Sequence, residues 1–219
     1  MALSLPTGTK VAIASAFATA YAVTAATNAT ETVLTVATGH GLIAGDYVAV
    51  RSGWSLLDYV VARVKTVVSD AVTLEGINTV STDRYPTGSG VGSVQKITTW
   101  TEITQIKKDG GLAVAGGEPK YAPSSTLDDP DDKQIPDGRS VTTFTMTVFD
   151  DPSLAWYPIV DAISDANTVS PLRMVFANGS RTLTNGYWSM AKTPVIANGQ
   201  INTLGLAFSA TCRATRYTT

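Results

Sequence analysis

The sequence predicts a mainly β protein: a β-sandwich or partly closed barrel with one short α-helix, plus a small inserted β-barrel-like domain. The first observation is the alternation of large apolar residues with hydroxyl or small residues, as in VTTFTMTVFD (residues 141–150) and TLGLAFSA (residues 203–210). Successive side chains of a strand point to opposite faces of a sheet, so this alternation is typical of half-buried antiparallel strands.

The second observation is the presence of turn-forming dipeptides between these runs. Asn-Gly dipeptides supply the positive φ angles that tight hairpin turns require. We therefore expect a tight connection at each of three pairs: Asn178-Gly179, Asn185-Gly186 and Asn198-Gly199.

The third observation is a single helical segment at residues 151–163, DPSLAWYPIVDAI. Asp151 and Pro152 suit the first turn of a helix. Pro158 lies inside the segment and has no N–H to donate to the carbonyl four residues back. We therefore expect a short helix that is kinked or begins late.

The composition limits the function. Charged residues make up 16% of the 219, apolar residues 44%, and the formal net charge is −2. This charge lacks the basic excess of a protein that grips phosphates, and no apolar run approaches membrane-spanning length. The N-terminal residues do not have the order of an export signal. The single cysteine, Cys212, is expected to be a buried or half-buried thiol in a strand.

The pattern divides the chain into three parts. Residues 1–24 hold a first strand at Thr9 to Phe17, and residues 97–219 hold the main alternating strands. Between them, residues 25–96 show short strands with tight turns, which would form the small inserted domain. The glycine-rich stretch at residues 85–93 is interpreted as a flexible return to the main part.

Residues 112–140 are interpreted as a long acidic loop without structure of its own. Prolines stand at four positions between residues 116 and 140, and Asp128, Asp129, Asp131 and Asp132 gather next to Lys133. A segment of this length is usually functional or disordered. The spacing does not fit a calcium loop, and carboxylates clustered on a flexible loop do not form a catalytic pair. His40 is the single histidine and is interpreted as a turn residue.

The ordered set of motifs resembles the tail tube proteins of long-tailed, non-contractile bacteriophages. The set comprises an alternating strand followed by a short helix, an apolar-F-x-N-G hairpin, an aromatic strand and a threonine-rich last strand. It covers residues 97–219 and the first strand at Thr9 to Phe17. The residues that carry the resemblance are Phe144, Met146, Trp156, Phe176, Asn178, Gly179, Trp188 and Phe208.

The resemblance implies a structural virion protein, not an enzyme, with no cofactor and no metal site. Its subunits would form hexameric rings that stack into a hollow tail tube, through which DNA reaches the host. Partners would be further copies of the chain, the tape measure protein in the lumen, and the tail terminator and tail-tip proteins. DNA would pass without specific binding, and no membrane insertion is implied. The protein would be made in the bacterial cytoplasm and reside in the virion.

In tail tube proteins the matching position is a long loop or hairpin that reaches the adjacent ring. The resemblance therefore assigns this acidic stretch to contacts between stacked rings, through Leu127, Asp128, Asp129, Asp131, Asp132 and Lys133. A solvated surface loop with no partner is the alternative. For the whole chain, two other classes stay open: a β-sandwich virion decoration or receptor- or glycan-binding module, and an enzyme acting on polysaccharide. No acid pair at a predicted strand end supports the enzyme.

Overall fold

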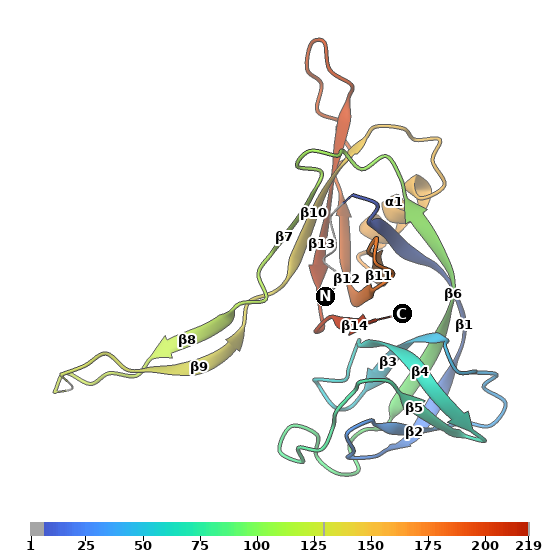
Figure 1. Cartoon of the computed structure of the whole chain (residues 1–219), viewed down its shortest axis with the longest axis vertical. Helices are drawn as coiled ribbons and strands as arrows, with labels where there is room; N and C mark the ends of the chain where they lie inside the picture. The colour runs from blue at the N-terminus through green and yellow to red at the C-terminus, as the bar shows by residue number, and fades with distance from the viewer. Residues whose placement is uncertain (1–6, 129, 219) are drawn as a thin grey trace.

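The computed structural model describes residues 7–128 and 130–218, and the described part is built almost entirely from β-strands (Figure 1). The order of elements is β1 (Lys10–Ala26), β2 (Val33–Val36), β3 (Tyr47–Ser52), β4 (Val61–Val68), β5 (Ala71–Leu74), β6 (Gly92–Ile103), β7 (Leu112–Ala115), β8 (Pro119–Pro123), β9 (Gln134–Arg139), β10 (Thr143–Phe149), α1 (Tyr157–Ala166), β11 (Val169–Val175), β12 (Arg181–Met190), β13 (Thr203–Ala210) and β14 (Thr215–Tyr217). The mainly β fold class with one short helix is confirmed.

Two long strands, β1 and β6, run from the lower part of the molecule into the upper part and belong to both of its halves (Figure 1). They pair antiparallel from Val11↔Ile103 to Val23↔Gly92, with three register shifts between. The first strand was expected to end near Phe17, but it continues to Ala26. The inserted residues therefore extend the strands of the main part, and no flexible linker leads into them.

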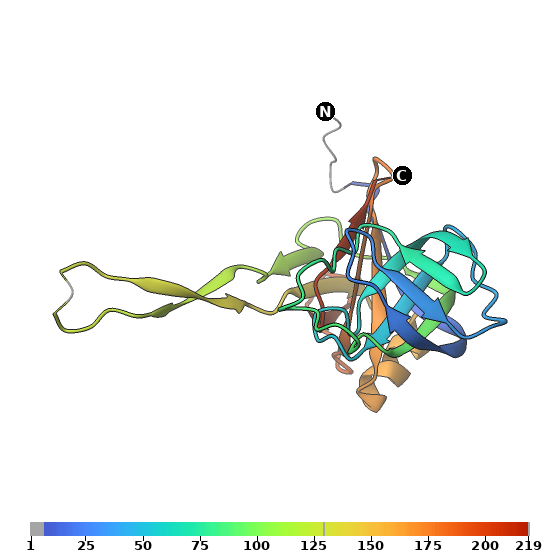
Figure 2. The same ribbon diagram turned by 90° about the horizontal axis from the view of Figure 1, so that it is seen from below.

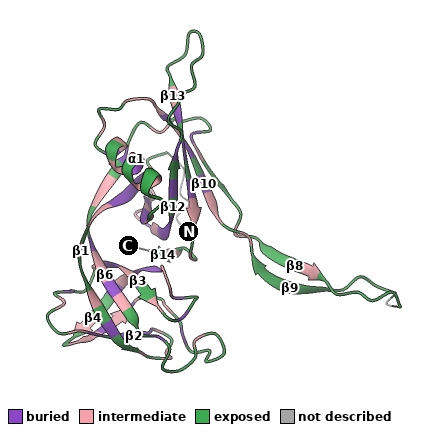
Figure 3. Ribbon diagram, turned by 180° about the vertical axis from the view of Figure 1, so that it is seen from behind, coloured by how far each residue is buried: buried purple, intermediate pink, exposed green. Residues whose placement is uncertain are grey.

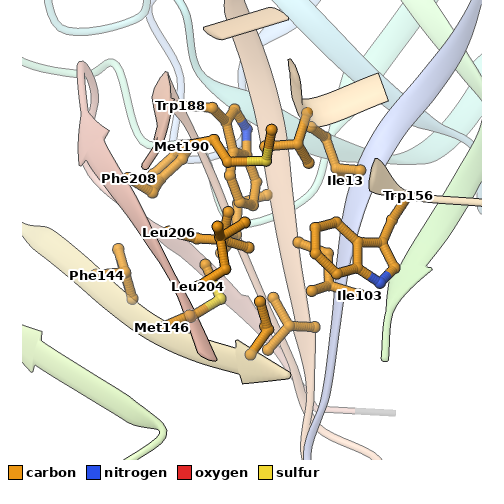
Figure 4. Close-up of a cluster of buried hydrophobic side chains, with 14 of the residues drawn as sticks. Ile13, Ile103, Phe144, Met146, Trp156, Trp188, Met190, Leu204, Leu206 and Phe208 are labelled. Carbon is orange, nitrogen blue, oxygen red and sulfur yellow. The ribbon is translucent and has the colours of Figure 1, made fainter. Parts of the chain in front are cut away.

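The upper half in Figure 1 is the core half, whose sheet has the order β6-β1-β11-β12-β13-β10-β7. Its apolar face curls around one cluster and is covered by α1. Inward residues from six strands meet there. The Phe208 ring lies edge-on to both Phe144 and Trp188, at centroid distances of 5.6 and 5.0 Å. Figure 4 shows these side chains interdigitating with Leu206 and Met146.

The lower half is the insert, whose strand order is β2-β5-β4-β3-β6-β1. An additional pairing of β1 with β2 closes this order into a ring-like arrangement around a second apolar cluster. The cluster contains the buried Trp54, whose Nε1 donates to the Pro86 carbonyl over 2.7 Å. Tyr85 packs edge-on against the same indole at 5.3 Å. The return segment expected to be flexible is thus fastened to the core of the insert.

A third cluster joins the two halves. Tyr47 and Val61 of the insert pack there against Leu183 and Tyr217 of the core half. The C-terminal strand β14 carries Tyr217 and pairs with β12. Thr215 adds a bond from its hydroxyl to the Val61 carbonyl, 2.7 Å long. The insert is therefore packed against the core half as well as continuous with it.

Two sequence predictions about local structure are wrong. The Asn185-Gly186 pair lies inside β12 and makes no turn. Helix α1 begins at Tyr157, with Pro158 in its first turn, so the late start was correct but Asp151 and Pro152 precede the helix. Asp151 instead accepts bonds from the Ser153 N–H and hydroxyl in a separate turn.

Candidate assembly surfaces

The most prominent surface feature is an arm formed by residues 116–140, which projects far from the body as a twisted ribbon (Figure 2). Strands β8 and β9 pair antiparallel in this arm, with Ala122 opposite Ile135. The expectation of a loop without structure of its own is therefore wrong. The arm is exposed along its length, and every residue of β9 is exposed (Figure 3).

The base of the arm depends on glycine. Gly116 and Gly117 have φ angles of +82° and +80°, which side chains rarely adopt. A Cβ on Gly116 would lie 1.9 Å from the Val141 carbonyl oxygen. Beyond this point the Arg139 guanidinium donates to the Gly117 carbonyl over 3.1 Å. These contacts set the direction in which the arm leaves the sheet.

The predicted assembly residues lie at the tip of the arm. Leu127 is fully exposed, and Asp128, Asp131, Asp132 and Lys133 are exposed around it, while Asp129 lies outside the described residues. A hydrogen bond from the Thr126 side chain holds the pKa of Asp128 below its ordinary range. Apolar side chains are exposed further back on the same ribbon, at Tyr121 (56%) and Ile135 (57%). The tip thus combines negative charge with unpartnered apolar surface.

A second projection was not recognised in the sequence. Residues 191–202, between β12 and β13, extend from the top of the core half as a long hairpin connection (Figure 1). Val195, Ile196 and Ile201 are 65%, 76% and 70% exposed on it. Exposed apolar residues that gather on one projection mark an interaction site more often than scattered ones do.

The core sheet also ends in open edges. Strand β6 pairs with β3 only from Gly92 to Lys96, so its last residues, 97–103, have β1 as their one neighbouring strand in the described chain. Within residues 7–128 and 130–218, strand β7 pairs with β10 alone. Figure 1 shows the two edges on opposite sides of the core half. An open edge presents unpaired backbone N–H and C=O groups that another chain can pair with.

The predicted motif residues lie in the core half rather than on these surfaces. Five of them are buried in its apolar cluster: Phe144, Met146, Trp156, Trp188 and Phe208. Phe176 packs at its margin, where the Arg216 guanidinium lies 5.3 Å above the ring. Asn178 and Gly179 form the β11–β12 turn, in which Asn178 Oδ1 accepts the Ser180 N–H over 3.1 Å. These residues shape the scaffold that carries the exposed surfaces.

Residues with reactive side chains do not gather. Among the described residues no group of three His, Cys, Asp or Glu side chains is placed to hold a metal ion. His40 accepts the Leu42 N–H at Nδ1 within a turn. Cys212 lies in a bend after β13 and not in a strand, and burial raises the pKa of its thiol. In the part of the chain that the structure describes, no helix is long and apolar enough to cross a bilayer.

Comparisons with known proteins place these features in context. A family model described as phage tail tube protein, TTP, matches residues 52–219, most of the chain. No curated protein matches. Among solved structures, a chain in the six-fold symmetrised cryo-EM structure of the anti-feeding prophage baseplate is similar, at 10% identity and a TM-score of 0.37. That match covers 55% of this chain and 85% of the other.

Proposed function

Because the chain belongs to the phage tail tube protein family, we propose that it is the subunit of six-membered rings that stack into a hollow tail tube. The tube conducts DNA to the host. The family establishes a structural tail protein; the ring, the stack and the passage of DNA are the proposal.

The pair of unlike open edges on the core sheet carries this proposal. Pairing the β6 edge of one subunit with the β7 edge of the next joins two different surfaces, which is a heterologous contact. Such contacts close into a ring when the rotation between neighbours divides a full turn. Backbone pairing along residues 97–103 would satisfy N–H and C=O groups that have no partner strand within the described chain.

The arm supports contacts between rings. It extends beyond the body that would form a ring, and its side chains at Tyr121, Leu127 and Ile135 have large exposed apolar areas. We propose that the tip residues 127–133, with their acidic side chains, contact a subunit of the adjacent ring. A ribbon contact of this kind lets stacked rings tilt, which suits a flexible, non-contractile tail.

The low content of basic residues supports a lumen through which DNA can pass. The chain has 16 Lys and Arg against 18 Asp and Glu, so it does not offer the dense positive surface that would hold DNA phosphates in place. During assembly the lumen would hold the tape measure protein, and the tube would end at terminator and tail-tip proteins. We propose that the insert, residues 25–96, lies on the outside of the tube and makes no contact that ring formation requires.

Deleting residues 118–137 tests the assignment of the arm. The deletion joins Gly117 to Gly138, which lie at the base of the ribbon. Because the core half does not pack on the arm, we expect an unchanged circular dichroism spectrum and melting temperature but no tubes by electron microscopy. Replacing residues 124–133 with a Gly-Ser segment of equal length is the matched variant, since it keeps the arm and removes the tip. Tubes of normal length from the deletion would contradict the assignment.

A further inference from the structure

A cavity of about 410 Å³ lies between the insert and the core half. Its walls come from β1, β3, β6, β11 and β12 and from the loop before β4. Ligand sites occur preferentially at such junctions, and this volume lies in the range of small-molecule sites. The proposed tube function assigns no role to this cavity.

Aromatic rings form much of the wall. Phe17 and Tyr187 are 38% and 46% exposed, and Tyr59 lines the same cavity. Exposed aromatic rings that gather around one hollow mark a binding site more often than scattered ones do. Their flat faces suit a ligand that itself presents a flat array of C–H groups.

Tyr59 is held in a strained conformation. Its φ of +63° lies in the left-handed region, which is unusual for a bulky residue. The Arg51 guanidinium lies 3.9 Å from the centre of the Tyr59 ring, and its Nε donates to Asp58 Oδ1 over 2.8 Å. Strain of this kind clusters at binding sites, where surrounding contacts impose it. Here the Asp58–Arg51–Tyr59 stack fixes the ring against the cavity.

Hydrogen-bonding groups complete the walls. Asn185 lines the cavity, and its Oδ1 accepts the Gly186 N–H over 3.1 Å, which leaves its Nδ2 as a donor for a ligand. An amide donor that lines a cavity can pair with an acceptor on a ligand, and a ligand without an acceptor would cover it at a cost. Gln95 donates to the Ala18 carbonyl through Nε2 over 2.9 Å, which leaves its Oε1 as an acceptor.

The charge of the site selects among ligands. Arg51 is the one charged residue in the wall, and Asp58 already pairs with it. An anionic ligand would therefore find little net positive charge, and an apolar one would leave the Asn185 amide unpaired. A neutral ring with C–H faces and hydroxyls around its rim matches both the aromatic walls and the amides.

We propose that this cavity binds one neutral hexose ring of a polysaccharide, stacked on Tyr59 and Tyr187 and hydrogen-bonded to Asn185. The site goes beyond tube formation and does not depend on it. A tail subunit with such a site would hold sugar chains weakly along its surface.

Saturation-transfer NMR on the full chain tests this site with the methyl glycosides of glucose, galactose, mannose, rhamnose and N-acetylglucosamine as probes. We expect transfer to at least one glycoside, with a dissociation constant on the order of millimolar for so small a ligand. Tyr187→Ala removes one stacking face and should weaken binding roughly tenfold. Tyr121→Ala, on the arm, is the matched control and should bind as the unmodified chain does.

The proposal is overturned by no transfer to any of the five glycosides, or by equal transfer in the unmodified chain and in Tyr187→Ala. Tyr59→Gly provides a second variant, because glycine relieves the positive φ while it removes the other ring. It should stay folded and also lose binding. Binding that survives in a folded Tyr59→Gly would equally contradict the site.

Discussion

The Tyr217 hydroxyl accepts a hydrogen bond from the backbone N–H of Arg63 over 2.9 Å, although 154 positions separate the two residues. The same hydroxyl donates to the Glu75 carbonyl at 3.3 Å, and the Arg63 guanidinium lies 4.8 Å from the centre of the Tyr217 ring. Burial raises the pKa of Tyr217, which keeps the hydroxyl protonated. The last strand of the core half is thereby fixed to β4 of the insert.

Tyr217→Phe should lower the free energy of unfolding by about 1–3 kcal/mol, because the part-buried Arg63 N–H loses its acceptor. Urea unfolding followed by fluorescence measures this difference. Tyr121→Phe, which removes an exposed hydroxyl from the arm, should leave the midpoint unchanged. A Tyr217→Phe variant as stable as the unmodified chain would show that β14 does not hold the two halves together.

The Arg63–Glu75 pair next to Tyr217 should make stability depend on pH. Arg63 donates through Nε and Nη2 to the two carboxylate oxygens, at 2.5 and 2.7 Å, and these bonds lower the pKa of Glu75 from its ordinary value of 4.5. A carboxylate with a lowered folded-state pKa contributes stability above its unfolded pKa, and this contribution is lost as pH falls through the folded value.

Chemical unfolding at a series of pH values measures this contribution. The unmodified chain should lose stability as the pH falls below about 4.5, and Glu75→Gln should lose less over the same interval while being less stable at neutral pH. Identical slopes for the two proteins would assign the acid sensitivity to other carboxylates.

Gly186→Ala should destabilise the core half by about 1–3 kcal/mol or more. A Cβ at this position would lie 2.1 Å from the Ser209 carbonyl oxygen and 2.7 Å from the Phe208 ring, so β12 and β13 would have to separate. Gly205→Ala is the matched control on β13, because its Cβ would meet only the Ala191 Cβ at 4.0 Å. Thermal melting of both variants checks this, and equal melting temperatures would refute the close approach.

Cys212 should react slowly with a thiol reagent in the folded protein. Burial raises its pKa above the ordinary 9.0, so the nucleophilic thiolate is scarce at neutral pH. Labelling with a disulfide reagent at pH 8 should be roughly tenfold or more slower in the native than in the denatured chain. Equal rates would place the thiol in open solvent.

The sequence predicted strands well where one face of the strand is buried. The alternation around Phe144 and the turn at Asn178-Gly179 both correspond to structure, because burial and turn geometry are local demands on residue type. The turn predicted at Asn185-Gly186 is absent, because Gly186 is needed for a different reason: β13 passes too close to leave room for a side chain. A contact with a strand so far along the chain leaves no local sequence pattern. An Asn-Gly pair therefore predicts a turn only when no neighbouring strand needs the space.

The arm and the open edges show a different limit. Strands of five and six residues, interrupted by prolines and exposed on all sides, have no apolar period to recognise, so residues 112–140 could be predicted only as polar and projecting. The edges of β6 and β7, and the cavity beside Tyr59, arise from the pairing of segments distant in the chain. Sequence patterns indicate which residues are buried. They give little indication of which strand lies at the edge of a sheet.

Negative-stain electron microscopy of the purified chain, first dilute and then concentrated, shows whether the subunits form a tube. We expect rings of uniform diameter with six-fold symmetry at low concentration and hollow tubes of the same width at high concentration. Single compact particles at every concentration, including after addition of preformed tail-tip complexes as initiators, would contradict the proposed tube.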